Sequence, residues 1–192
     1  MPAIPRLPGL ALALGLLAAA APAAHADDEG SEHTATLMGA DDDTRGLSLA
    51  FTDRAGWIAT YRSAPGATAV TLRLPLPRDH AHFVAHVAPG RRGFVIVEVS
   101  MGWSRPTTLP ATRPVAWHFD RRGRLTRTWR YDQMLLPATR AAARVSAGHV
   151  DWTNAVTVRG GSLVLGTSDG RHEVVVDTSR AAIRQVARPA VP

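Results

Sequence analysis

From residue 46 onward, apolar side chains recur at every second position in short stretches, and glycine-containing turns separate these stretches. Val70, Leu72 and Leu74, for example, fall on the same side of an extended chain. This period indicates strands with one buried face, and tight turns at such spacing are typical of antiparallel hairpins. The sequence therefore predicts an all-β fold built as an antiparallel meander of hairpins, with residues 46–192 as a single domain.

Segments 51–62 and 119–130 share one hairpin pattern, in which Asp-Arg, a glycine and then Thr-aromatic-Arg follow one another. We expect the aspartate to cap the turn, Gly56 and Gly123 to adopt positive φ, and the aromatic side chain to pack inward. Repeated hairpins of this kind resemble β-propeller blades, which are four-stranded and about 40–45 residues long. The domain would hold about three or four such units, whereas a closed propeller needs at least about four blades. A partial β-propeller-like fold and a β-sandwich or open barrel are both left open.

Three segments depart from the alternating pattern. Residues 102–114 contain three prolines and predict an irregular loop. Residues 137–146 begin with a proline, continue with strong helix formers and are followed by Gly148, so they predict one short helix. Residues 179–188 fit either a capped helix or a last strand.

The first 26 residues have the three parts of a cleavable secretory signal peptide. Arg6 supplies the positive charge, an apolar run follows over residues 7–23, and Ala24-His25-Ala26 is a small-x-small cleavage motif. The apolar run is shorter than the roughly 20 residues that a membrane span needs, and no later segment is apolar for longer. We therefore expect cleavage near Ala26, a periplasmic or secreted location and no transmembrane span in the mature chain.

Charge is unevenly distributed along the chain. Residues 27–44 hold seven acidic side chains and no arginine, whereas residues 45–192 hold 21 arginines against nine acids. We expect residues 27–45 to form a flexible acidic leader and the basic body to suit an acidic partner, either a protein or an anionic component of the envelope. Every basic residue is arginine, as a GC-rich genome favours, and export keeps the chain from nucleic acid. The high isoelectric point therefore does not indicate nucleic-acid binding.

The densest basic run lies next to aromatic residues, and this combination is common in recognition surfaces. Its members on the expected hairpin are Arg121, Arg122, Arg124, Arg127, Trp117 and Trp129. A second grouping, Trp103 and Arg105, lies in the proline-rich loop, where binding residues are common. These eight residues are the predicted binding surface; the alternative interpretation is a solvated hairpin in a lysine-free protein.

A second hypothesis concerns three histidines, His80, His82 and His86, which would share one face of a strand. Neutral imidazole is a good ligand for zinc or copper, so this spacing suggests a metal-binding protein. Val84 interrupts the row, and no second group of cysteines or histidines completes a ligand shell. Apart from this zinc or copper site, we expect no cofactor.

A third hypothesis is a serine hydrolase, because Gly166-Thr-Ser168-Asp-Gly170 matches the Gly-x-Ser-x-Gly pattern. That motif exposes its serine where a strand turns sharply into a helix, yet both flanks here predict strands. No phosphate-binding loop, dinucleotide fingerprint or Cys-x-x-Cys motif is present in the sequence. The sequence therefore favours a non-catalytic interaction protein over an enzyme.

Overall fold

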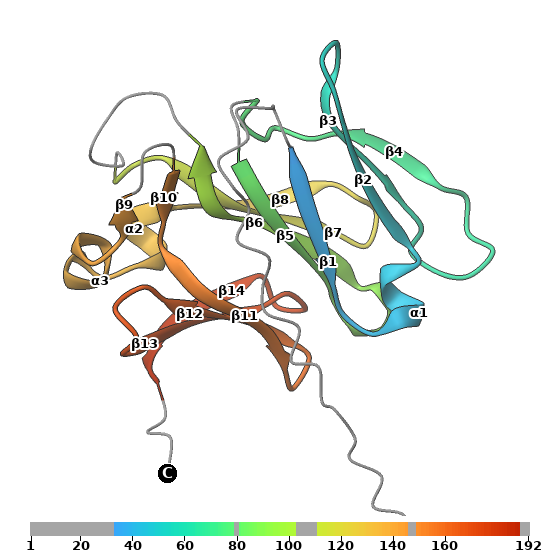
Figure 1. The fold of residues 1–192 in the computed structure, drawn as a ribbon. Helices are drawn as coiled ribbons and strands as arrows, with labels where there is room; N and C mark the ends of the chain where they lie inside the picture. Colours follow the sequence, from blue (N-terminus) through green and yellow to red (C-terminus); the bar gives the residue numbers. More distant parts are fainter. Residues whose placement is uncertain (1–32, 79–80, 103–110, 146–148, 189–192) are drawn as a thin grey trace, which may run out of the picture. The chain divides into compact units, whose positions relative to one another are not determined.

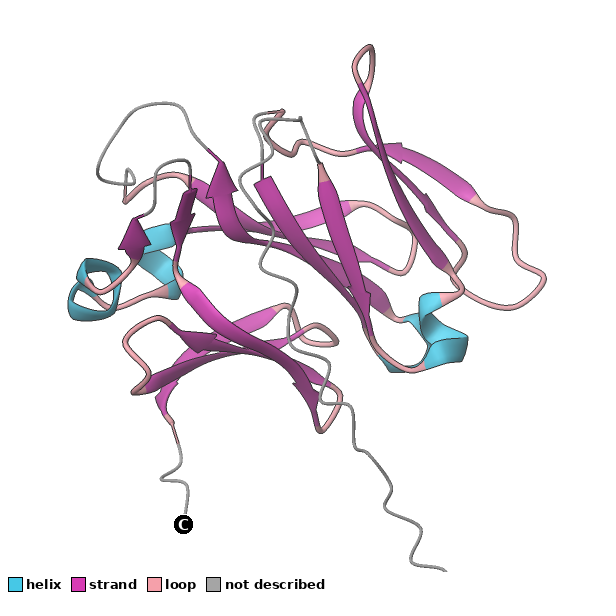
Figure 2. Cartoon of the chain, in the orientation of Figure 1, coloured by secondary structure: helices cyan, strands magenta, loops and turns pink. Residues whose placement is uncertain are grey.

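The computed structural model describes residues 33–78, 81–102, 111–145 and 149–188 (Figure 1). These residues form fourteen strands in three sheets, with few and short helices. The predicted all-β fold is confirmed, and Figure 2 shows how completely strands dominate the described chain.

A seven-stranded central sheet contains strands from most of the chain. Its members are β1 (Thr34–Met38), β5 (Ala81–Val87), β6 (Gly93–Gly102), β7 (Pro114–Asp120), β8 (Leu125–Arg130), β9 (Arg144–Val145) and β10 (His149–Asp151). Strands β5 to β8 pair antiparallel in chain order, as the meander predicts. β6 is long enough to pair with β7 along its first half and with β10 at its end.

Two smaller sheets complete the fold, and both are simple meanders. The N-terminal sheet holds β2 (Leu47–Thr52), β3 (Gly56–Tyr61) and β4 (Val70–Arg73). The C-terminal sheet holds β11 (Thr153–Arg159), β12 (Ser162–Thr167), β13 (His172–Asp177) and β14 (Ala182–Ala187). The segment that fitted a helix or a strand is therefore the strand β14. The choice between a propeller-like and a sandwich-like arrangement stays a prediction.

Both turns of the repeated sequence pattern are hairpins. Gly56 between β2 and β3 and Gly123 between β7 and β8 each have a φ of 75°, which glycine adopts readily. At the second turn, Asp120 Oδ1 accepts hydrogen bonds from the backbone N–H groups of Arg122 and Arg124 at 2.8 and 3.0 Å. At the first turn the cap comes instead from Thr52, whose Oγ1 accepts from the Ala55 N–H at 3.1 Å.

The helical segments are single turns: α1 (Asp41–Thr44), η1 (Pro89–Arg91), α2 (Tyr131–Met134) and α3 (Pro137–Ala141). The helix predicted over residues 137–146 begins at Pro137 as expected but ends at Ala141. Arg144 and Val145 form β9 instead, because they pair with β10 at the border of the central sheet.

Two apolar cores cover opposite faces of the central sheet. The N-terminal core contains alternate side chains of β5 and side chains of β3, β6 and β7. Its members include Phe83, Ala85 and Val87 of β5, Trp57, Ala59 and Tyr61 of β3, and Phe94, Ile96, Trp117 and Phe119 of β6 and β7. Val84 points the other way, into the C-terminal core, where Val95, Val97 and Trp129 meet Leu163, Leu165, Val174 and Val176 of the C-terminal sheet. The central sheet is therefore buried on both faces.

Part of the acidic segment, predicted from its charge as a flexible leader, belongs to the folded structure. β1 pairs in parallel with β5, and Ala35 and Leu37 pack against the N-terminal core. The Arg91 Nε–H donates to the Asp42 carbonyl at 3.0 Å, which ties α1 to η1. From Thr34 onward, the segment predicted as a flexible leader thus takes part in the sheet, because alternating apolar positions lie between its two acidic groups.

Candidate functional site

The predicted basic hairpin is β7–β8, and its arginines are exposed. β8 pairs only with β7 among the described residues, so it forms an edge of the central sheet. Arg121 and Arg122 lie in the turn, and Arg124, Arg127 and Arg130 follow along the edge, all of them exposed. Arginine on a sheet edge discourages pairing with other strands and presents a cationic rim.

Intramolecular contacts fix three of these arginines. Arg124 pairs with Asp120 at 2.9 Å, and Arg130 pairs with Asp132 at 3.1 Å. The guanidinium of Arg127 lies 5.2 Å from the ring centre of Trp129, and its Nη1 donates to the Ala181 carbonyl at 3.1 Å.

Arg121 and Arg122 differ from these three. Within the described part of the chain neither has an ion pair or a side-chain hydrogen bond to a protein group, and both side chains lie at the exposed hairpin tip. They are therefore the arginines of the hairpin whose charge is available to a partner.

The two tryptophans of the predicted surface are buried, with 3% of Trp117 and 4% of Trp129 exposed. They point to opposite faces of the central sheet, Trp117 into the N-terminal core and Trp129 into the C-terminal core. Each therefore packs one face of the hairpin against an apolar core, and neither exposes its ring as a contact surface. Trp103 and Arg105 lie outside the described residues.

A pocket of about 310 Å³ lies at the base of the hairpin, at the end away from its tip. Its walls are Pro75, Leu76 and Pro77 from the segment after β4, and Arg113, Pro114 and Trp117 from the start of β7. The Arg113 guanidinium is held by the buried Glu98 carboxylate, with 2.7 Å between Nη2 and Oε1. This pocket could not be predicted from the sequence, in which the two prolines of Leu74-Pro75-Leu76-Pro77 are the one local signal of it.

The predicted histidine row is divided by the fold. His82 is exposed at the start of β5, and its Nδ1 lies 2.9 Å from Thr34 Oγ1. His86 is buried, with its Nδ1 2.6 Å from Thr178 Oγ1. His80 lies outside the described residues. Within the described residues, no three histidine, cysteine, aspartate or glutamate side chains lie close enough together to hold a metal ion. The zinc or copper site stays a prediction.

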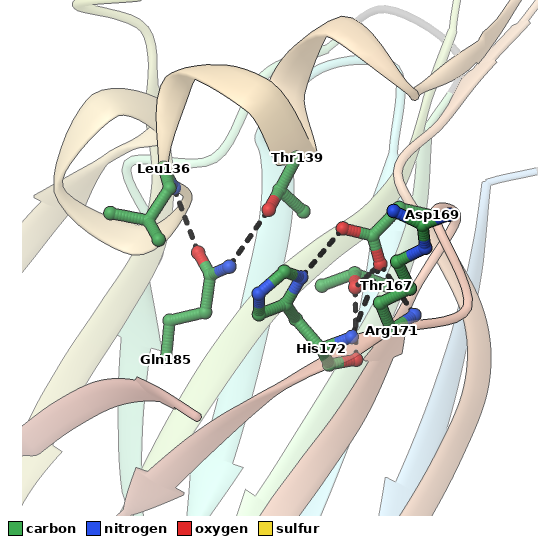
Figure 3. A network of polar contacts seen from close by, with 7 residues as sticks. All are labelled: Leu136, Thr139, Thr167, Asp169, Arg171, His172 and Gln185. Atoms are coloured by element: carbon green, nitrogen blue, oxygen red, sulfur yellow. Dashed lines mark hydrogen bonds and ion pairs between the residues drawn. The ribbon is translucent and has the colours of Figure 1, made fainter. Parts of the chain in front are cut away.

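Ser168 lies in the hairpin turn between β12 and β13, not at a strand-to-helix elbow. Its hydroxyl donates to the Asp151 carbonyl at 2.8 Å. The neighbouring Asp169 organises the turn, as Figure 3 shows: it accepts from the Thr167 hydroxyl at 2.6 Å and lies 2.7 Å from His172 Nδ1. The serine is thus part of a hydrogen-bonded turn, the context expected when both flanks are strands.

We expect Asp169→Ala to lower the free energy of unfolding by about 1–2 kcal/mol at pH 7, because it removes the acceptor of several turn hydrogen bonds. Desolvation alone would raise the pKa of Asp169, but hydrogen bonds from Thr167, Arg171 and His172 lower it well below its ordinary value. The stabilisation is therefore complete above about pH 5 and declines as the pH falls below about 4. Urea unfolding of the wild type and the variant, above pH 5 and below pH 4, measures this contribution to stability.

The matched control is Asp53→Ala, in the β2–β3 turn. No side-chain hydrogen bond of Asp53 stabilises that turn among the described residues, and this change should move the unfolding free energy by less than about 0.5 kcal/mol. Equal losses in the two variants would contradict the role given to Asp169.

Comparison with protein-family models, curated proteins and solved structures gives no match for this chain. None of the helices in the described ranges is long and apolar enough to cross a membrane. The described residues themselves offer a cationic sheet edge with an apolar pocket at its base, an arrangement suited to binding.

Proposed function

We propose that this chain is an exported, non-catalytic binding protein that recognises an acidic partner through the exposed arginines of the β7–β8 hairpin. The observation that carries the proposal is the state of Arg121 and Arg122, which lie exposed at the tip without an ion pair among the described residues. The predicted signal peptide of residues 1–26 supports export, and the partner would be an acidic protein or an anionic component of the envelope.

The fixed neighbours of Arg121 and Arg122 support the same proposal. Asp120 holds Arg124 and caps the turn, so the tip keeps one backbone conformation before a partner arrives. A planar guanidinium can make paired hydrogen bonds to a carboxylate or phosphate, and a preformed site loses less entropy on binding. The net positive charge of the body would also speed the approach of an acidic partner.

The test is charge reversal at the tip, with Arg121→Glu/Arg122→Glu as bait in a pull-down from the envelope fraction of the native host. We expect recovery of the partner to fall at least about tenfold, because two attractive contacts become repulsive. The wild-type recovery should also fall as salt rises from about 50 to 300 mM.

The matched control is Arg184→Glu/Arg188→Glu, which makes the same change in net charge at two exposed arginines near the C-terminal sheet edge. It should retain the partner. If the tip variant captures every protein and polymer that the wild type captures, the hairpin is not the recognition surface.

A further inference from the structure

Two buried histidines lie in one row across the central sheet. In the strand register, His86 of β5 lies opposite Val95 of β6, which lies opposite His118 of β7. Only 1% of His86 and 6% of His118 is exposed. The row belongs to the face that packs on the C-terminal sheet, because Val84 and Val95 belong to that core.

Thr178, in the β13–β14 turn, contacts both rings and is itself fully buried. Its Oγ1 lies 2.6 Å from His86 Nδ1, and its carbonyl oxygen lies 2.8 Å from His118 Nε2. One residue of the C-terminal sheet is therefore held by two histidines of the central sheet, from positions 92 and 60 residues away in sequence.

The hydrogen-bond partners define the tautomer of His118. A carbonyl can only accept, so His118 Nε2 carries the proton and donates to Thr178. In the neutral ring Nδ1 must then accept, so the single hydroxyl proton of Thr126 points to Nδ1 at 2.5 Å rather than to the more distant His118 carbonyl at 3.3 Å. Both nitrogens of His118 are thus satisfied without a charge on the ring.

The charged groups that face this row do little to favour a protonated ring. The charge of Asp43 in α1 favours protonation of His86, and that of Asp120 in β7 favours protonation of His118. Neither ring, however, hydrogen-bonds to a carboxylate among the described residues. Arg127 of β8 lies opposite His118 and holds the same turn through the Ala181 carbonyl. Asp177 and Arg180 of that turn pair with each other at 3.2 Å. The site therefore stabilises neutral rings.

We propose that the His86–Thr178–His118 clasp holds the C-terminal sheet on the central sheet at neutral pH and releases it on acidification. The two sheets would separate at the face lined by the clasp, while the N-terminal core on the opposite face stays packed.

The direction follows from proton uptake. Burial lowers the pKa of His86 to about 4 and also lowers that of His118. Once released, an exposed histidine returns to a pKa near 6.5, so the released form takes up the proton first. The clasp is therefore at full strength above pH 6.5 and weakens as the pH falls toward 4. For His86 alone, going from pH 7.5 to 5 increases the released population about 30-fold.

Amide hydrogen exchange of the full chain tests the release. Rates at pH 7.5 and 5 are corrected for intrinsic exchange and compared between peptides from β12–β13 and from β2–β3. We expect opening of β12–β13 to become at least about 30-fold more frequent at pH 5 and β2–β3 to change by less than threefold. In this reference sheet, Phe51 of β2 stacks with His33. An equal increase in both peptides, or no increase, overturns the proposal.

Two substitutions keep a hydrogen-bonding group toward Thr178 and remove the titration. In His86→Asn the side-chain amide takes the place of Nδ1, and in His118→Gln it takes the place of the Nε2–H donor. The double variant should show the same opening of β12–β13 at both pH values, whereas the control His82→Gln, at an exposed position, should behave as the wild type. Persistent pH-dependent opening in the double variant overturns the proposal.

A measurement on the wild type covers the case in which the double variant fails to fold. Imidazole resonances followed by NMR between pH 8 and 4 give the pKa of each ring. A value of about 4 for His86 and a lowered value for His118 support the clasp, and ordinary values near 6.5 for both rings overturn it.

Discussion

Replacing Arg113 by methionine is expected to lower the free energy of unfolding by about 3–5 kcal/mol at pH 7, because it breaks the ion pair that Arg113 makes with the buried Glu98 carboxylate. Glu98 is 0% exposed, and its Oε1 lies 2.7 Å from Arg113 Nη2. Methionine keeps most of the apolar stem of arginine, so the loss measured by urea unfolding reports the charge rather than the packing. The substitution also changes one wall of the pocket at the base of the hairpin.

The matched control for Arg113→Met adds Glu98→Gln to the same chain. Removing the carboxylate charge together with the guanidinium should restore about half of the lost stability or more, because the buried negative charge that Arg113 offsets is then absent. If the two losses simply add, the ion pair is not what stabilises this region. Binding by Arg113 variants can be interpreted only after this comparison, since unfolding alone would also abolish recognition.

The hairpins could be predicted from the sequence because their information is local. Gly56 and Gly123 each mark a turn by their own conformational freedom, and the alternating side chains on either side define the paired strands. The parallel pairing of β1 with β5 could not be predicted in this way. Thr34 lies opposite His82, 48 residues away, and five residues among acidic neighbours carry no local sign of that partner.

The candidate site also has features that local sequence predicts and features that depend on contacts between distant segments. That Arg121 and Arg122 lie exposed follows from their place in a polar turn, which the sequence shows. The burial of Trp117 and Trp129 on opposite faces depends on the strand register and on two separate cores. The closeness of the two tryptophans to the arginines in the sequence shows neither the register nor the cores. His86 was predicted as a metal ligand, and its contact with Thr178, 92 residues away, could not be predicted from the sequence. Such contacts depend on how sheets pack.

Truncating Trp152 to alanine should cost about 3–5 kcal/mol, since its large side chain is 1% exposed within the C-terminal core. Trp152 lies between β10 of the central sheet and β11 of the C-terminal sheet, where the chain crosses from one sheet to the other. Its indole N–H donates to the Glu98 carbonyl at 2.7 Å. Far-UV circular dichroism during urea unfolding measures the loss.

The conservative change Trp152→Phe separates the indole hydrogen bond from the packing, and Trp57 provides the matched control. Trp57 is as deeply buried, but no acceptor lies within hydrogen-bond reach of its Nε1 among the described residues. Trp57→Phe therefore loses no side-chain hydrogen bond among the described residues, whereas Trp152→Phe loses the hydrogen bond from the indole N–H to the Glu98 carbonyl. We expect Trp152→Phe to cost about 1 kcal/mol more than Trp57→Phe. Equal losses of unfolding free energy in the two variants would mean that the indole hydrogen bond does not stabilise the segment between β10 and β11.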